Sequence, residues 1–177
     1  MFTSRARKRA RLATLGFALA GILLPLLLPS GTPVSFWLVM FYVLLVVNAY
    51  FSIRCFGSFE GAEAPLQKTL DVLLALMYLG LPLQFTDAKK FMALSAAMFL
   101  VAAAKYTLLL SGGGSTRLLA RKIFVDNLGT AVSLIMLLGA GTPNETSVLT
   151  FGVLATLAAN VYILWLKPLY VLPSARA

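Results

Sequence analysis

The sequence predicts an all-α membrane protein: a bundle of six transmembrane helices arranged as three antiparallel hairpins, with both termini in the cytoplasm. Three observations lead to this prediction, namely the composition, six apolar stretches and the placement of Lys and Arg. Of the 177 residues, 60% are hydrophobic and 12% are charged, whereas an ordinary soluble domain carries about 25% charged residues. A soluble domain of this size could not bury so much apolar surface. We therefore expect lipid around the protein.

Each predicted helix corresponds to one apolar stretch that is long enough to cross a bilayer. A helix needs about 20 residues to cross a hydrocarbon core that is ~30 Å thick. The stretches cover residues 12–29, 34–53, 69–86, 91–110, 121–140 and 147–167. Residues 12–171 thus form the predicted transmembrane domain, between a basic N-terminus (1–11) and a tail (172–177) that are both cytoplasmic. The first stretch exceeds the 7–15 apolar residues of a signal peptide, and we expect it to be retained.

Short connections predict that consecutive helices are antiparallel neighbours. Residues 29–33 and 139–144 are rich in Pro and Gly and read as turns. Residues 111–115, Ser-Gly-Gly-Gly-Ser, read as a flexible link, because neither a strand nor a Gly-Lys-Ser/Thr motif accompanies them. The chain is therefore expected to form three hairpins in series.

The distribution of Lys and Arg predicts the orientation, because cytoplasmic loops carry the excess of these residues. One side has the basic N-terminus, both ends of the second link, the start of the fifth stretch and the tail: Arg5, Arg7, Lys8, Arg9, Arg11, Arg54, Lys68, Arg117, Arg121, Lys122, Lys167 and Arg176. The other side has Lys89 and Lys90. Together with an Ala- and Leu-rich composition, this pattern predicts a bacterial inner-membrane protein.

The composition also excludes several classes of function. The net charge of +9 does not indicate nucleic-acid binding, because the basic residues lie at the ends of apolar stretches and leave no soluble basic face. The chain has no His and a single Cys, Cys55, which excludes imidazole-ligated metals and His-based nucleophile pairs. No catalytic motif is present. We expect no enzyme activity, no cofactor and no metal site.

Polar residues recur at similar depth, one or two turns inside the predicted cytoplasmic surface. Ionisable groups inside a membrane segment are costly, so they normally face the bundle interior and pair. In one interpretation Lys105 pairs with Asp71 or Asp126 and the layer is structural; in the other it lines a vestibule for an ion or small polar solute. The candidate residues are Asn48, Tyr50, Asp71, Lys105, Tyr106, Asp126, Asn127, Asn160 and Tyr162.

The charges of this layer do not balance in the sequence. Lys105 is its one deep base, so two inward-facing carboxylates would leave one of them without an ionic partner. The Asn or Lys residues at 48, 105 and 160, each followed by a Tyr, also indicate a partial threefold repeat of the hairpin.

Two further patterns concern packing. The second stretch is bulky, with Phe41 and Tyr42 among its aromatic residues, and is predicted to face lipid or a partner subunit. Pro25 and Pro82 fall inside predicted helices and are expected to kink them.

Two functional hypotheses follow. The first is a small channel or carrier for an ion or small solute, acting as an oligomer. The second is a non-catalytic accessory or assembly subunit of a larger membrane complex. The expected partners are membrane lipids, together with either further copies of this chain or another membrane protein.

Overall fold

The computed structural model describes residues 4–27, 33–56, 65–111, 116–166 and 169 and is all-helical over them. Most of the predicted glycine-rich link and the whole of the 172–177 tail lie outside the described residues. The elements are α1 (Ser4–Leu23), η1 (Leu24–Leu27), α2 (Phe36–Phe56), α3 (Pro65–Gly80), η2 (Leu81–Gln84), α4 (Ala88–Ser111), α5 (Thr116–Gly139), α6 (Glu145–Val161) and η3 (Tyr162–Leu166).

The prediction of an all-helical fold with six helices long and apolar enough to span a membrane is confirmed. Several helices begin before their apolar stretch does. α1 begins at Ser4, because the Arg, Lys and Ala residues ahead of the stretch are themselves good helix formers. α3 begins at Pro65, and proline suits the first turn of a helix because its missing N–H would have no partner there.

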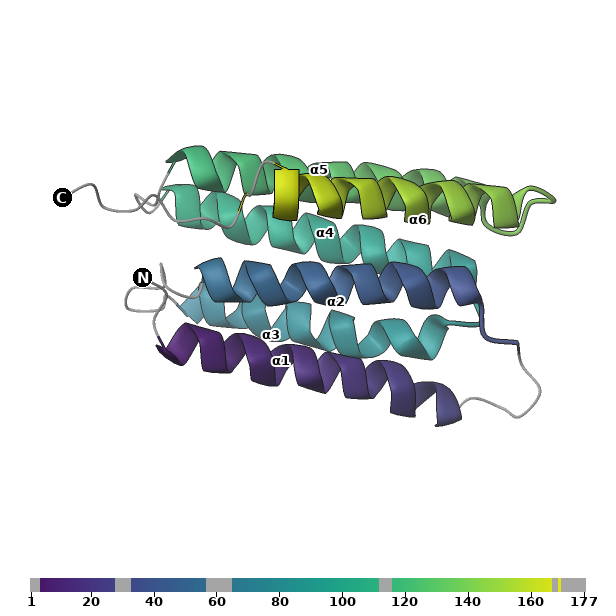
Figure 1. Ribbon diagram of the computed structural model, residues 1–177, viewed down its shortest axis with the longest axis horizontal. Helices are drawn as coiled ribbons and strands as arrows, with labels where there is room; N and C mark the ends of the chain where they lie inside the picture. Colours follow the sequence, from purple (N-terminus) through teal and green to yellow (C-terminus); the bar gives the residue numbers. More distant parts are fainter. Residues whose placement is uncertain (1–3, 28–32, 57–64, 112–115, 167–168, 170–177) are drawn as a thin grey trace.

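The helices lie side by side along the long axis of the molecule (Figure 1). α2 and α4 are central, with α1 and α3 on one side of them and α5 and α6 on the other. The most extensive interface joins α4 to α5, followed by that between α1 and α2. Since α4 and α5 belong to different predicted hairpins, the grouping into three hairpins stays a prediction.

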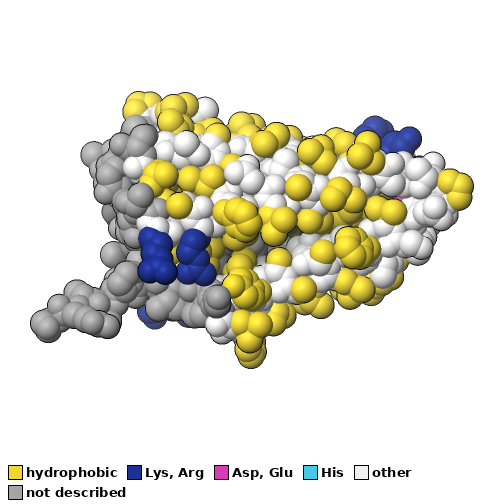
Figure 2. Space-filling view, turned by 90° about the horizontal axis from the view of Figure 1, so that it is seen from above, with side chains coloured by type: hydrophobic (Ala, Val, Ile, Leu, Met, Phe, Trp, Pro, Cys, Tyr) yellow, Lys and Arg dark blue, Asp and Glu magenta, His cyan; other side chains and the backbone are white. Residues whose placement is uncertain are grey.

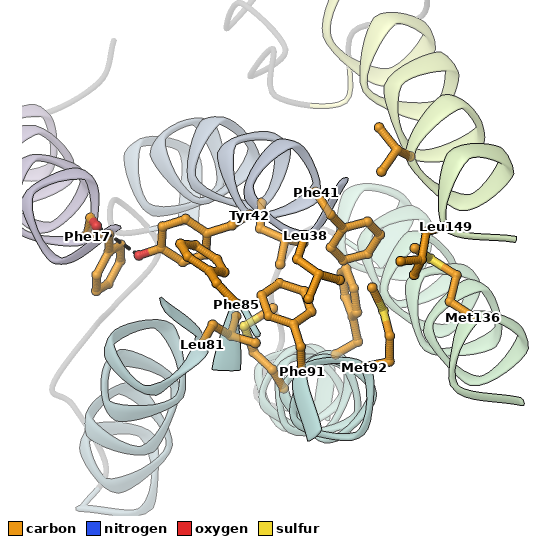
Figure 3. Close-up of a cluster of buried hydrophobic side chains, with 14 of the residues drawn as sticks. Phe17, Leu38, Phe41, Tyr42, Leu81, Phe85, Phe91, Met92, Met136 and Leu149 are labelled. Atoms are coloured by element: carbon orange, nitrogen blue, oxygen red, sulfur yellow. Dashed lines mark hydrogen bonds between the residues drawn. The ribbon is translucent and has the colours of Figure 1, made fainter. Parts of the chain in front are cut away.

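A core of buried aromatic and aliphatic side chains joins α2, η2, α4, α5 and α6 in the half of the bundle away from the N-terminus, and partly buried residues of α3 pack against it (Figure 3). Phe41, Phe85 and Phe91 are fully buried, and their rings meet at centroid separations of about 6 Å. The prediction that α2 faces lipid or a partner through Phe41 and Tyr42 is wrong. These residues are 0% and 2% exposed, because α2 lies at the centre, where large side chains fill the space between helices.

The two intrahelical prolines end α-helices rather than kink them. Pro25 lies in η1 after α1, and Pro82 lies in η2 after α3. A proline lacks the N–H for the i→i−4 bond, and a tighter 3₁₀ turn tolerates that loss near a helix end. The next helix, α4, begins after Asp87, whose carboxylate accepts a hydrogen bond from the Lys90 backbone N–H at 3.0 Å.

Candidate functional site

A cavity of about 200 Å³ lies inside the half of the bundle that carries the N-terminus. Five helices line it, α1 to α5. Most of its wall is apolar, but three bases and two acids face it, a formal excess of one positive charge: Arg9, Lys105, Lys122, Asp71 and Asp126. In a low-dielectric interior, charges placed so close together interact strongly.

Asp71 of α3 links two bases from other helices. Its carboxylate forms an ion pair with Lys105 of α4 and a second one with Arg9 of α1, the latter at 3.2 Å. The Lys105 side chain is 8% exposed, Asp71 is 23% exposed and Arg9 is 46% exposed. The network therefore runs from the interior to the surface, and this edge of the cavity reaches solvent between α1 and α3.

Asp126 of α5 pairs with Lys122 of the same helix. The two side chains are 1% and 5% exposed, so the pair is buried. The expectation that one inward carboxylate lacks an ionic partner is wrong, because Lys122 turns inward instead of reaching the surface. Oδ2 of Asp126 has no hydrogen-bond partner among the described residues, and it is buried in this conformation.

Tyr106 of α4 lies between the two charged groups. Its hydroxyl is 2.6 Å from the Ser52 hydroxyl of α2. The Nζ atoms of Lys122 and Lys105 lie 5.0 Å and 5.8 Å from the centre of its ring. Both distances fall within the range of cation–π attraction, so the ring helps to hold two like charges on one side of the cavity.

Phe17 and Tyr78 line the inner end of the cavity, and Tyr42 holds their backbones. Phe17 of α1 stacks on Tyr78 of α3, with ring centroids 4.6 Å apart. The Tyr42 hydroxyl donates to the backbone carbonyls of Phe17, at 2.8 Å, and of Tyr78, at 3.2 Å. Beyond these contacts the aromatic core fills the bundle (Figure 3). The cavity is thus blocked at one end.

The nine predicted site residues divide into three groups. Asn48, Asp71, Lys105, Tyr106 and Asp126 line the cavity. Asn160 and Tyr162 line a separate groove between α5 and α6, whose wall Asn48 shares. Tyr50 is half-buried against Phe51, and Asn127 faces outward, exposed. Tyr50, Tyr106 and Tyr162 occupy matching positions of the proposed partial repeat, but the structure places them in different surroundings.

Among the polar lining residues, sequence reasoning missed Arg9, Ser52, Tyr78 and Lys122. Lys122 could have been found from the sequence, because it precedes Asp126 by four residues, and this spacing puts two side chains on one helix face. No sequence pattern distinguishes Arg9, because it is one of several bases close together. Which of these bases turns inward depends on how α1 packs.

These features define a class: an all-helical protein with six helices long and apolar enough to cross a membrane and a charged cavity inside one half of the bundle. In the part of the chain that the structure describes, no group of three or more His, Cys, Asp or Glu side chains is placed to hold a metal ion. No protein-family model matches the chain, and neither the curated proteins nor the solved structures contain a match to it.

Proposed function

We propose that the protein is a bacterial inner-membrane carrier that binds a small ion or polar solute in the cavity lined by helices α1 to α5. The observation that supports this most directly is the set of five charged side chains around one cavity of about 200 Å³. Ionisable residues within membrane segments are costly and mark substrate or ion pathways in general.

A carrier fits the cavity better than an open channel does. Arg9 and Asp71 reach the surface at one edge, while Phe17, Tyr78 and Tyr42 block the other end. A site that is open to one side and sealed on the other is what alternating access requires. The orientation proposed from the basic residues puts the open edge on the cytoplasmic side.

The test is to reconstitute the purified protein in liposomes and to measure the electrical current that follows a concentration jump of sodium, potassium, chloride or phosphate, or a jump of pH. We expect the wild type to give a current with one of these solutes, and Asp71→Asn to abolish it. The double variant Lys122→Gln/Asp126→Asn, which stays neutral as a pair, should also abolish it. Asp87→Asn, an acid on the surface away from the cavity, is the matched control and should retain it.

Gel filtration and the thermal midpoint establish that each variant is folded before its current is compared. A wild type that gives no current with any of the five jumps would contradict ion transport. Folded cavity variants with wild-type current would show that the charged network is structural. A wild type without current would favour the accessory-subunit hypothesis, although not through Phe41 and Tyr42, which are buried.

A further inference from the structure

A groove of about 1240 Å³ lies between α5 and α6, separate from the charged cavity. Asn48 and Phe99 line both spaces, so they form part of the wall between them. Figure 2 looks down on the face of the bundle that carries α5 and α6, and it shows hydrophobic side chains over most of that face with Lys and Arg side chains near its ends. The groove is larger than the ~300–1000 Å³ of ordinary small-molecule pockets.

The walls of the groove are apolar, and small residues make room for it. Ala155, Ala158 and Ala159 line it from α6, and Gly129 lines it from α5. Along α5 the lining runs from Arg117 to Val132, which is about 22 Å at 1.5 Å per residue. Half of a ~30 Å hydrocarbon core is about 15 Å, so the groove is long enough for the acyl chain of a lipid from one leaflet.

One end of the groove is basic. Arg117 and Arg121 are four residues apart on α5 and both line it, so their guanidinium groups lie on one helix face. Among the described lining residues none is acidic. Arginine binds phosphate groups with paired hydrogen bonds, and the charge of this end therefore suits a phosphate.

Two observations on α6 and η3 support a ligand in the groove. Asn160 is 6% exposed and lines the groove, and its side-chain oxygen has no hydrogen-bond partner among the described residues. Beyond Val161 the helix widens to the π-helix η3 over Tyr162–Leu166, and Tyr162, Ile163 and Leu166 of this turn line the groove. Such wide turns are rare and occur frequently at functional sites.

We propose that the groove binds an anionic phospholipid, with its phosphate between Arg117 and Arg121 and one acyl chain between α5 and α6. This inference rests on the proposed insertion in a membrane, but not on transport. A second copy of the chain is a poorer occupant. A twofold axis along the bundle would bring a second Arg117 and Arg121 to the same end, and like charges repel each other there.

The experiment is native mass spectrometry of the full-length protein, released from nanodiscs that contain phosphatidylglycerol and phosphatidylcholine in equal amounts. The wild type should retain phosphatidylglycerol in preference to phosphatidylcholine. The double variant Arg117→Gln/Arg121→Gln should weaken that retention about 30-fold. Each basic residue near anionic lipid contributes ~1 kcal/mol, and the loss of two such contributions corresponds to this factor. Arg7→Gln/Lys8→Gln removes the same charge from exposed residues of α1 and is the control, which should retain the lipid.

A second pair of variants tests the acyl-chain part of the groove. Ala158→Phe should displace the lipid, whereas Ala18→Phe on the exposed face of α1 should not.

Equal retention of both lipids by the wild type, or unchanged retention in the Arg117/Arg121 variant, would overturn the proposal. A bound second copy or other polypeptide in place of lipid would also overturn it. Extraction of the wild type from cell membranes by alkaline carbonate would instead contradict membrane insertion itself.

Discussion

Asp126 is a buried acid whose partner lies one helical turn away on the same helix. Lys122 and Asp126 are both inaccessible, so each charge depends on the other. The desolvation of two charges largely offsets their mutual attraction, and a buried pair adds little net stability. Removing one partner is different, because it leaves a charge in the interior without compensation.

We therefore expect Asp126→Asn and Lys122→Gln each to lower the free energy of unfolding by about 3–5 kcal/mol. The double variant should lose much less, because no charge then remains at this site. Thermal or denaturant unfolding of the four proteins in detergent forms a double-mutant cycle that measures the coupling. If the effects of the two single changes were additive, the pair would not be coupled as the structure places it.

Asp87 stabilises the start of α4 from outside the predicted spans. The backbone N–H of Lys90 and then its side chain donate hydrogen bonds to the Asp87 carboxylate, and these bonds lower the pKa of the carboxyl below its usual value. A lowered pKa means that the folded state favours the ionised form. The stabilisation is thus present above the pKa of the unfolded chain and is lost as the pH falls through the pKa of the folded protein.

Asp87→Ala should cost about 1 kcal/mol, the usual loss on removing a helix N-cap. Asp87→Asn should keep most of the cap, since Asn also accepts a hydrogen bond there, but should lose the contribution that depends on pH. The measurement is the thermal midpoint of the wild type and both variants between about pH 2.5 and pH 6. A wild type and an Asp87→Asn variant with parallel pH profiles would argue against this role of the carboxylate.

The contact between α4 and α5, the most extensive in the bundle, depends on a glycine. A Cβ atom on Gly129 of α5 would lie 2.5 Å from a ring carbon of Phe99 on α4. Real contacts are never so short, and a packed aromatic ring cannot move aside easily. Gly16 of α1 has the opposite surroundings, with nothing within 4 Å of the same position.

Gly129→Ala should therefore destabilise the protein by about 1–3 kcal/mol, as overpacking does. Gly16→Ala should be neutral or stabilising by up to about 1 kcal/mol, because alanine is the better helix former. Thermal unfolding of both variants compares them directly. Phe99→Leu should recover part of the loss in Gly129→Ala, and a failure of this rescue would place the strain elsewhere.

The helices themselves could be predicted from the sequence because a lipid-spanning segment needs a long apolar run, and such runs can be read locally. The side of each helix that faces inward could not be predicted, because a helix that is apolar on all sides has no pattern that distinguishes its buried face from its exposed face. The bulky residues of α2 illustrate this: Phe41 is as apolar as Phe124, yet Phe41 is fully buried and Phe124 is 69% exposed. Polar residues are better guides, and Asp71, Lys105 and Asp126 do meet at one cavity.

At the scale of the whole molecule, charge and cavity lie at the same end of the bundle. The start of α1, the end of α2 and the starts of α3 and α5 carry the basic residues there, and the charged cavity opens on that side. At the other end lie Lys89, Lys90, Asp87 and Glu145. If this asymmetry sets the orientation, the cavity edge at Arg9 and Asp71 opens to the cytoplasm.

Single cysteines test this orientation in intact cells. Cys55 is buried, and Cys55→Ala provides a background without reactive thiols. On it, Thr142→Cys between α5 and α6 should react with a membrane-impermeant maleimide from outside. Arg7→Cys near the start of α1 should react only after the cells are made permeable. Both positions are exposed in the structure, so neither should be shielded by the protein itself. The reverse pattern would turn the cavity toward the outside, and solutes applied to that face would then be the ones to test.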